Sequence, residues 1–305
     1  MTSVGNDTIL LSSSVGNDTK EITVMKKAVL AIPMAALLMV GCSSGSSAAK
    51  SASSASSAST EEKASSKEPD IEVKTGIEDN KQWGTYIANL VYSNDKLIAV
   101  DLDLVDADGN SGKEKYNDYG IKKVSSINKE WWEQVEDYEQ YLVKNDGKTA
   151  ETDKDGHAVD KNLVSGATIS LADFSTAINN AEKGVPAKTD QTTVKTGWKY
   201  SPEWGTYLAN VVERDGKTVK VLVDRIDNDG SIAREKYDNY GIKKVSSINK
   251  DWWEQAEAYE EYVLKNGADA VKYDKDGHAT DPDLLSGATI DISDFNDAVK
   301  DAESK

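Results

Sequence analysis

Few of the residues that build most catalytic and metal sites are present in this sequence. Its 305 residues include one cysteine, Cys42, and two histidines, His157 and His278. A single cysteine excludes an internal disulfide and a cysteine-based zinc site. Each histidine follows an Asp-Gly pair without further ligands at a usual metal spacing, so both are interpreted as turn residues. The sequence also lacks a glycine-rich phosphate loop, a serine-hydrolase elbow and a histidine-based catalytic pair, which argues against a hydrolase.

Basic residues are fewer than acidic ones. The sequence has 36 Lys and Arg against 53 Asp and Glu, a formal net charge of −17 at pH 7. This excess argues against nucleic acid and against anionic lipid surfaces as partners. It is compatible with cationic or metal-ion partners, although acidic surfaces are also common on exported proteins for solubility alone. Asp103, Asp106 and Asp108 suggest calcium, but their spacing does not fit an EF-hand, and an acidic hairpin turn is expected instead.

The apolar run at residues 28–40 is too short to span a bilayer, which takes roughly 20 residues. It follows Met25-Lys26-Lys27 and precedes Gly41-Cys42, an arrangement typical of a secretory signal. Residues 25–42 resemble a bacterial lipoprotein signal peptide with a lipobox, in which Cys42 becomes the lipidated first residue of the mature protein. The alternative, a free buried thiol, is less favoured because no core adjoins the cysteine. Residues 1–24 are interpreted as a non-native upstream extension, with Met25 as the initiator.

Residues 43–70 form a Ser/Ala-rich stretch without a periodic apolar pattern, so no packed structure is expected there. As a flexible coil of about 26 residues, this tether reaches roughly 30 Å. A lipid anchor followed by a tether suits the extracellular face of the cytoplasmic membrane in a Gram-positive cell.

The rest of the chain is a tandem duplication. The tetrapeptide Ser-Gly-Ala-Thr ends at Thr168 and again at Thr289, and 289 − 168 = 121 gives the spacing. The same spacing relates Trp83 to Trp204 and His157 to His278, without insertion or deletion. The sequence predicts one domain at residues 71–184, a linker at 185–192 and a second domain at 193–305.

Each copy carries strand signals first and helix signals later. Residues 86–100 and 207–223 read as β-hairpins. Trp131, Val135, Tyr138 and Leu142 then fall on one face of a helix, with Asn128 or Asn249 as the expected N-cap. Short closing helices are expected at 171–181 and 292–302, capped by Ser170 or Ser293. Strands followed by helices without βαβ alternation indicate an α+β fold in each domain.

The Ser-Gly-Ala-Thr loop is the main candidate site. It offers a threonine hydroxyl beside residues too small to hinder approach, and a glycine that lets the backbone come near a phosphate. On chemistry alone this signal is weak, because a loop that ends in threonine before a helix is ordinary.

The sequence around each loop, NLVSGATIS and DLLSGATID, resembles the flavinylation motif of the FMN-binding domain family. In that family a flavin transferase moves FMN from FAD onto the last threonine as a phosphoester. The resemblance implies two covalent FMN groups per chain, attached to Thr168 and Thr289. The motif residues are Ser165, Gly166 and Ala167 with Asp160 and Asn162 upstream, and Ser286, Gly287 and Ala288 with Asp283 upstream.

The family motif usually carries an acidic residue three positions before the serine. Asp283 matches this in the second copy, whereas the first has Asn162, with Asp160 two positions further back. We therefore expect any incomplete loading to occur at Thr168.

The family includes subunits of respiratory complexes and two-domain surface lipoproteins. The resemblance implies an electron carrier that links a membrane quinol-linked donor to extracellular acceptors such as ferric iron or free flavins, without a specific substrate pocket of its own. Trp132 and Trp253 border the buried helix face and are the candidates for stacking on the flavin ring. The alternative is a non-catalytic surface lipoprotein whose duplicated aromatic faces bind a ligand or mediate adhesion.

Overall fold

The computed structural model describes residues 68–305. The predicted upstream extension, the signal peptide with Cys42 and the tether up to residue 67 lie outside the described residues. Within residues 68–305, none of the helices has the length and apolar character needed to cross a membrane.

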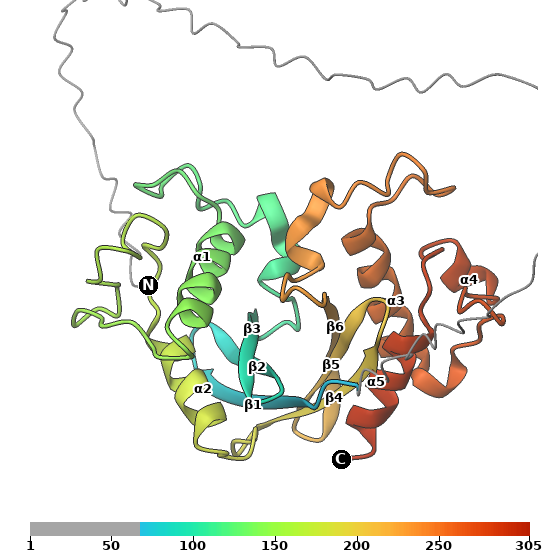
Figure 1. The fold of residues 1–305 in the computed structure, drawn as a ribbon, viewed down its shortest axis with the longest axis horizontal. Coiled ribbons are helices and arrows are strands. Elements are labelled where there is room, and N and C mark those ends of the chain that lie inside the picture. The colour runs from blue at the N-terminus through green and yellow to red at the C-terminus, as the bar shows by residue number, and fades with distance from the viewer. Residues whose placement is uncertain (1–67) are drawn as a thin grey trace, which may run out of the picture. The chain divides into compact units, whose positions relative to one another are not determined.

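Each repeat has an antiparallel three-stranded sheet followed by helices, which confirms the α+β expectation (Figure 1). The strand order follows the sequence, β1-β2-β3 and β4-β5-β6. The first repeat contains β1 (Ile71–Asn80), β2 (Gly84–Ser93), β3 (Lys96–Val105), the 3-10 segment η1 (Lys113–Asp118), α1 (Trp131–Lys144) and α2 (Ala172–Glu182). The second contains β4 (Thr192–Ser201), β5 (Gly205–Arg214), β6 (Lys217–Ile226), η2 (Arg234–Asn239), α3 (Trp252–Asn266), η3 (Ala268–Ala270), α4 (Pro282–Leu285) and α5 (Ser293–Glu303).

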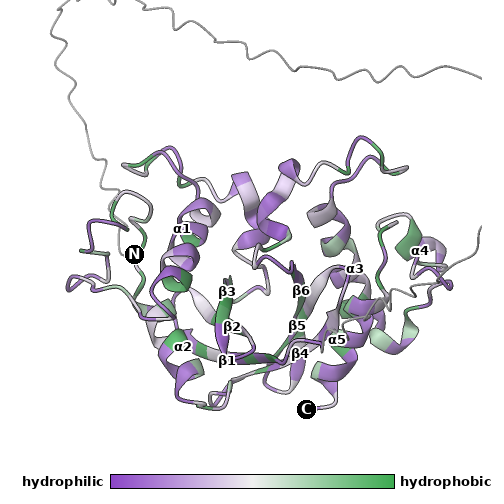
Figure 2. Ribbon diagram, viewed as in Figure 1, coloured by the Kyte–Doolittle hydropathy of each residue, from purple (hydrophilic) through white to green (hydrophobic). Residues whose placement is uncertain are grey.

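The predicted hairpins are β2-β3 and β5-β6, but the sequence pattern does not predict β1 or β4. Both are edge strands rich in polar residues, so their apolar alternation is weak (Figure 2). Gly76 explains why α2 packs directly on β1, because a Cβ there would lie 2.1 Å from the carbonyl oxygen of Ala177. Gly197 has the same relation to Ala298 of α5.

The predicted helix face is confirmed, since Trp131, Val135, Tyr138 and Leu142 of α1 are all buried. The predicted caps are wrong. Glu130 and Asp251 are the N-caps of α1 and α3, each in a capping box with the glutamate three residues later. Asn128 and Asn249 instead end the preceding turn at positive φ, and the closing helices follow Leu171 and Ile292, not a serine cap.

Both faces of each sheet are buried. One face packs on helices of the same repeat, as Ala88, Leu90 and Leu102 do against α1 and α2. The other face joins apolar side chains of both repeats, and these form a cluster of Ile77, Ile87, Val105, Val194, Val212 and Leu222. Within residues 68–305 the two repeats thus belong to one compact unit, in which each has its own helix-packed core and both share a further apolar cluster.

Equivalent residues of the two repeats meet each other. Asn89 donates to Asn210 at 2.8 Å, and Asn210 donates back at 3.2 Å. The rings of Tyr116 and Tyr237 are stacked with centroids 4.2 Å apart. Because residues 121 positions apart are direct partners, the repeats are related by an approximate two-fold axis that passes between them.

Candidate functional site

A buried glutamine holds the threonine of each Ser-Gly-Ala-Thr loop. Gln134 Oε1 accepts hydrogen bonds from the backbone N of Thr168 at 2.8 Å, from Thr168 Oγ1 at 3.1 Å and from the N of Ile169 at 3.2 Å. Gln255 Oε1 accepts from the N and Oγ1 of Thr289 at 2.7 and 3.1 Å. The same polar contact therefore positions both threonines, which are themselves half-buried.

The orientation of each glutamine amide is fixed from its other side. Gln134 Nε2 donates to the carbonyl oxygen of Lys129 at 3.1 Å, and Gln255 Nε2 donates to that of Lys250 at 3.0 Å. The two glutamines are 0% exposed, so their oxygens stay directed at the loops. Sequence reasoning missed them. One feature of the sequence could have identified them. Both copies have a glutamine three residues after the buried tryptophan, a polar residue beside the apolar face of the helix.

The other motif residues are either buried in the core or exposed on the surface. Ala167 and Ala288 are buried, which anchors the loops in the core, whereas Ser165 and Ser286 are exposed. Asp160 caps the turn before the first loop by accepting a hydrogen bond from the backbone N–H of Asn162. This hydrogen bond lowers the pKa of the Asp160 carboxyl below its usual value. Asn162 and Asp283, the pair that differs between the repeats, are both exposed.

The surroundings of the two loops differ in charge. A cavity of about 500 Å³ adjoins the first loop, lined by Ser165, Gly166, Lys129 and Asp137 among others. Asp137 forms an ion pair with Lys129 and lies against the loop, since a Cβ on Gly166 would come within 2.9 Å of its side chain. In the second repeat the residue equivalent to Asp137 is Ala258.

Lys250, the second-repeat equivalent of Lys129, has no ion-pair partner among residues 68–305. The second loop thus has Ala258, and not a carboxylate, against its glycine.

Trp132 and Trp253 do not lie beside the threonine loops. Their rings belong to a cluster between the repeats, in which Trp132 is 4.5 Å from Tyr237 and Trp253 is 5.4 Å from Tyr116. Each residue of an α-helix turns about 100°, so Trp132 lies about 200° around α1 from Gln134. This placement gives no support to their predicted stacking on a flavin. Tyr116 and Tyr237 hold the cluster together at positive φ, 40° and 39°, a strained backbone that occurs in both repeats.

The histidines and the acidic triplet lie in surface turns or in the packed interior. The backbone N of His157 donates to Asp153 Oδ1 at 2.9 Å, and the imidazole is about half exposed. Asp106 accepts from the backbone N of Asp108 in the turn that follows β3, while Asp103 is buried. Across the described residues, no group of three or more candidate ligands is arranged to hold a metal ion.

A second open cavity, of about 540 Å³, is lined by Trp83 and Tyr119 in the first repeat. Trp83 is 51% exposed, an unusual position for a tryptophan side chain. In the second repeat Arg225 takes the place of Leu104 and lies over the ring of Trp204 at 5.4 Å. Trp204 is 47% exposed, close to the value for Trp83, so the two tryptophans differ in their neighbours more than in their exposure.

No protein-family model matches this chain, and no curated protein matches it. One matching solved structure is a protein from Clostridium thermocellum studied by NMR in solution. It is 24% identical, and the match covers 39% of this chain and 93% of that chain with a TM-score of 0.28. A TM-score this low supports no conclusion about fold or function.

Proposed function

We propose that this protein is an electron carrier with FMN joined covalently to Thr168 and Thr289. The observation that supports the proposal is that both threonines are held alike, by a fully buried glutamine at the same helix position. A hydroxyl that donates to an amide oxygen keeps its own lone pairs free to form a bond. The resemblance of both loops to the flavinylation motif points to the same two oxygens.

The residues around the loops fit such a group. The threonine side chains are partly exposed, the flanking glycine and alanine are small, and the cavity beside the first loop lies within the size range of small-molecule sites. Lys129, which lines the cavity beside the first loop, would place an ammonium near the phosphate there. When bound, FMN would supply reversible electron transfer. The protein's contribution would be to fix the attachment oxygen and keep the loop in place.

A covalent link suits a protein outside the cell. Noncovalent retention at nanomolar affinity takes about 12 kcal/mol, and dilution would still remove the cofactor over time. We further propose that Cys42 carries a lipid anchor at the extracellular face of the membrane. Electrons would then pass from a membrane quinol-linked donor to ferric iron or free flavins, after a flavin transferase has loaded the protein.

The test is to co-express the full chain with a flavin transferase, with FAD available, and measure intact mass after denaturation. We expect up to two FMN adducts in the native sequence, one in Thr168→Val or Thr289→Val, and none in the double variant. Thr176→Val is the matched control, because its hydroxyl is exposed on α2 and bonds only to the carbonyl of Ala172. Flavin lost on denaturation, or a double variant that keeps both adducts, would refute the proposal.

The charge difference between the loops gives a second test. We expect Asp137→Ala to raise the share of Thr168 that is loaded, and Ala258→Asp to lower that of Thr289, because a carboxylate against the loop repels the phosphate. Peptide mapping measures each share. An unchanged share in both variants would show that Asp137 does not control loading. It would leave the Asn162 difference as the remaining explanation for unequal loading.

The second candidate function is capture of a ligand by the exposed tryptophans. The open cavity beside Trp83 favours it. A protein that stays colourless in the loading experiment, and that loses its ligand with Trp83→Ala, would support this function instead.

A further inference from the structure

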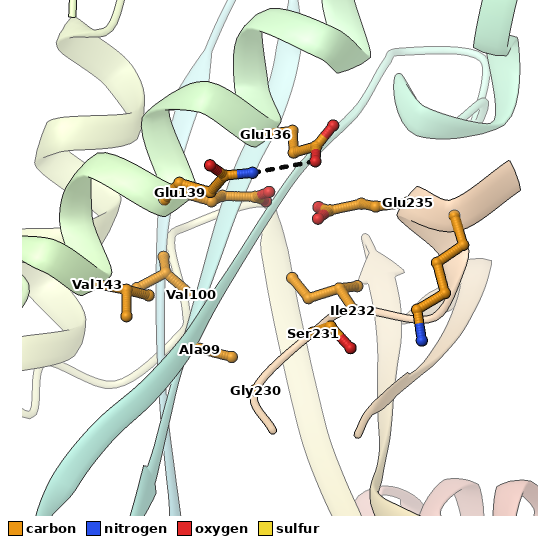
Figure 3. A pocket seen from close by; sticks show the side chains of 11 residues that line it. Ala99, Val100, Glu136, Glu139, Val143, Gly230, Ser231, Ile232 and Glu235 are labelled. Carbon is orange, nitrogen blue, oxygen red and sulfur yellow. Dashed lines mark hydrogen bonds between the residues drawn. The ribbon is translucent and has the colours of Figure 1, made fainter. Parts of the chain in front are cut away.

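A small acidic cavity lies between the two repeats. It has a volume of about 170 Å³ and is bounded by β3, α1 and residues 230–236 of the second repeat. Figure 3 shows the carboxylates of Glu139 and Glu235 pointing toward one another, with Glu136 nearby. The side chain of Glu139 is 3% exposed, and its Oε2 has no hydrogen-bond partner among the described residues. Glu260 Oε2, its counterpart in the second repeat, also lacks a partner among these residues, so the two sides differ in what occupies the space beside this carboxylate and not in the oxygen itself.

The approximate two-fold axis shows what fills the equivalent position on the other side. Ala99 lines the cavity, and 99 + 121 = 220, so its counterpart is Lys220. Glu235 corresponds to Glu114 and Glu139 to Glu260 by the same spacing. Lys220 is 8% exposed, and its Nζ lies 2.6 Å from Glu114 Oε2. On that side a built-in ammonium pairs with Glu114, whereas on the first side alanine leaves the space open.

The first side is therefore one cation short. Lys113 Nζ bonds to Asp101 and Glu235 at 2.8 Å and to Glu139 at 3.0 Å. Burial raises the pKa of Glu136 to about 7, and burial also raises that of its counterpart Glu257 to about 7, so this carboxyl does not distinguish the two sides.

The second side pairs its carboxylates with two cations, Arg234 and Lys220. Lys236 also lines the first cavity, but its ammonium bonds to Asp227 and is directed to that partner. The missing charge on the first side thus corresponds to the ammonium of Lys220.

We propose that this cavity binds ammonium or the head group of a small primary amine, at the position equivalent to Lys220 Nζ. An ammonium group at this position would donate to Glu235, the counterpart of the Glu114 that Lys220 bonds, and would have further N–H donors for the other groups that line the cavity. Within residues 68–305 no carboxylate cluster is arranged for metal coordination, which favours a hydrogen-bonded ammonium over a metal ion. The proposal does not depend on flavin attachment, because the Ser-Gly-Ala-Thr loops do not line this cavity.

The test is to titrate the full chain with ammonium and with methylammonium chloride in amine-free phosphate buffer, and to follow the thermal midpoint and calorimetric binding. Sodium, potassium, calcium and tetramethylammonium chlorides at equal ionic strength are the comparison arms. A ligand that binds only the folded state raises the midpoint in a saturable way. We expect one equivalent to bind, and Glu235→Gln to weaken binding by at least about tenfold, since it removes the carboxylate equivalent to the partner of Lys220.

Two exchanges across the axis sharpen the test. Ala99→Lys supplies the cation internally, so we expect a raised midpoint without ligand and no response to methylammonium. Lys220→Ala opens the second side, so we expect a lowered midpoint, a second equivalent bound and recovery with methylammonium. If Ala99→Lys does not fold, the Lys220→Ala and Glu235→Gln results decide.

Three outcomes would overturn the proposal. The first is no saturable response in either the native sequence or Lys220→Ala. The second is a larger response to calcium or potassium than to methylammonium, which would assign the cavity to a metal cation. The third is a native response that Glu235→Gln leaves unchanged, which would place the bound amine elsewhere.

Discussion

Replacing Gln134 by methionine tests the contact that holds the first threonine loop. The change keeps an unbranched side chain of similar size and removes the amide. Three hydrogen bonds accepted at 2.8, 3.1 and 3.2 Å are lost. At about 1 kcal/mol each, they sum to about 3 kcal/mol, and water reaching the half-exposed loop offsets part of this. We expect the free energy of unfolding to fall by about 2–3 kcal/mol.

Urea unfolding of the protein without flavin measures this loss. Gln140→Met is the matched control, because Gln140 lies on the same helix but is exposed and bonds only to Glu136; we expect a change under about 0.5 kcal/mol. Hydrogen exchange gives a local readout. The amides of Thr168 and Ile169 should exchange faster in Gln134→Met, while that of Thr289 should not change. Equal stability of the two variants, or unchanged exchange at Thr168, would refute the role given to the glutamine.

The remaining predictions concern the interior between the repeats and the anchor. Lys113→Met leaves the carboxylates of Asp101, Glu139 and Glu235 without their cation and should cost about 3–5 kcal/mol in urea unfolding. Lys115→Met breaks a partly exposed pair with Asp106 and should cost less than about 1 kcal/mol. Because the pKa of Glu136 is raised to about 7 in the folded protein, its carboxylate destabilises the fold increasingly as pH rises from its ordinary value of 4.5. Glu136→Gln should thus match the native stability near pH 4.5 and exceed it at pH 8, and the opposite order would contradict the assignment. Cys42→Ala should release the protein from the membrane fraction with its fold intact, and continued membrane attachment would point to another anchor.

The sequence predicts those parts of the fold that depend on neighbours along the chain. The hairpins and the buried face of α1 follow from apolar spacing, and both are present. The edge strands β1 and β4 escape prediction because their residues alternate weakly. The predicted N-caps are wrong because Asn128 and Ser170 match only the general preference of helix N-caps for asparagine and serine. In the structure Glu130 forms a capping box with Glu133, so α1 begins at a different residue.

The candidate site also has a part that the sequence predicts and a part that it does not. The threonines can be selected from a repeated short motif, since the motif is local. Gln134 lies 34 residues from Thr168, so its role depends on how α1 packs on the loop. Trp132 borders the core face of its own helix, and its ring packs on Tyr237 of the other repeat. The spacing of apolar residues within one repeat carries no information about contacts with the other repeat.

Asn89 and Asn210 pair across the approximate two-fold axis, and this pairing of equivalent residues bears on how the sequences of the two repeats can diverge. Two separate identical chains meeting at such a surface would carry every substitution on both sides of the axis. One continuous chain can alter a single side, as it does where Ala99 stands opposite Lys220. The covalent connection also makes the pairing of the halves independent of protein concentration. Duplication within one chain therefore allows the halves to specialise while each remains the obligatory partner of the other.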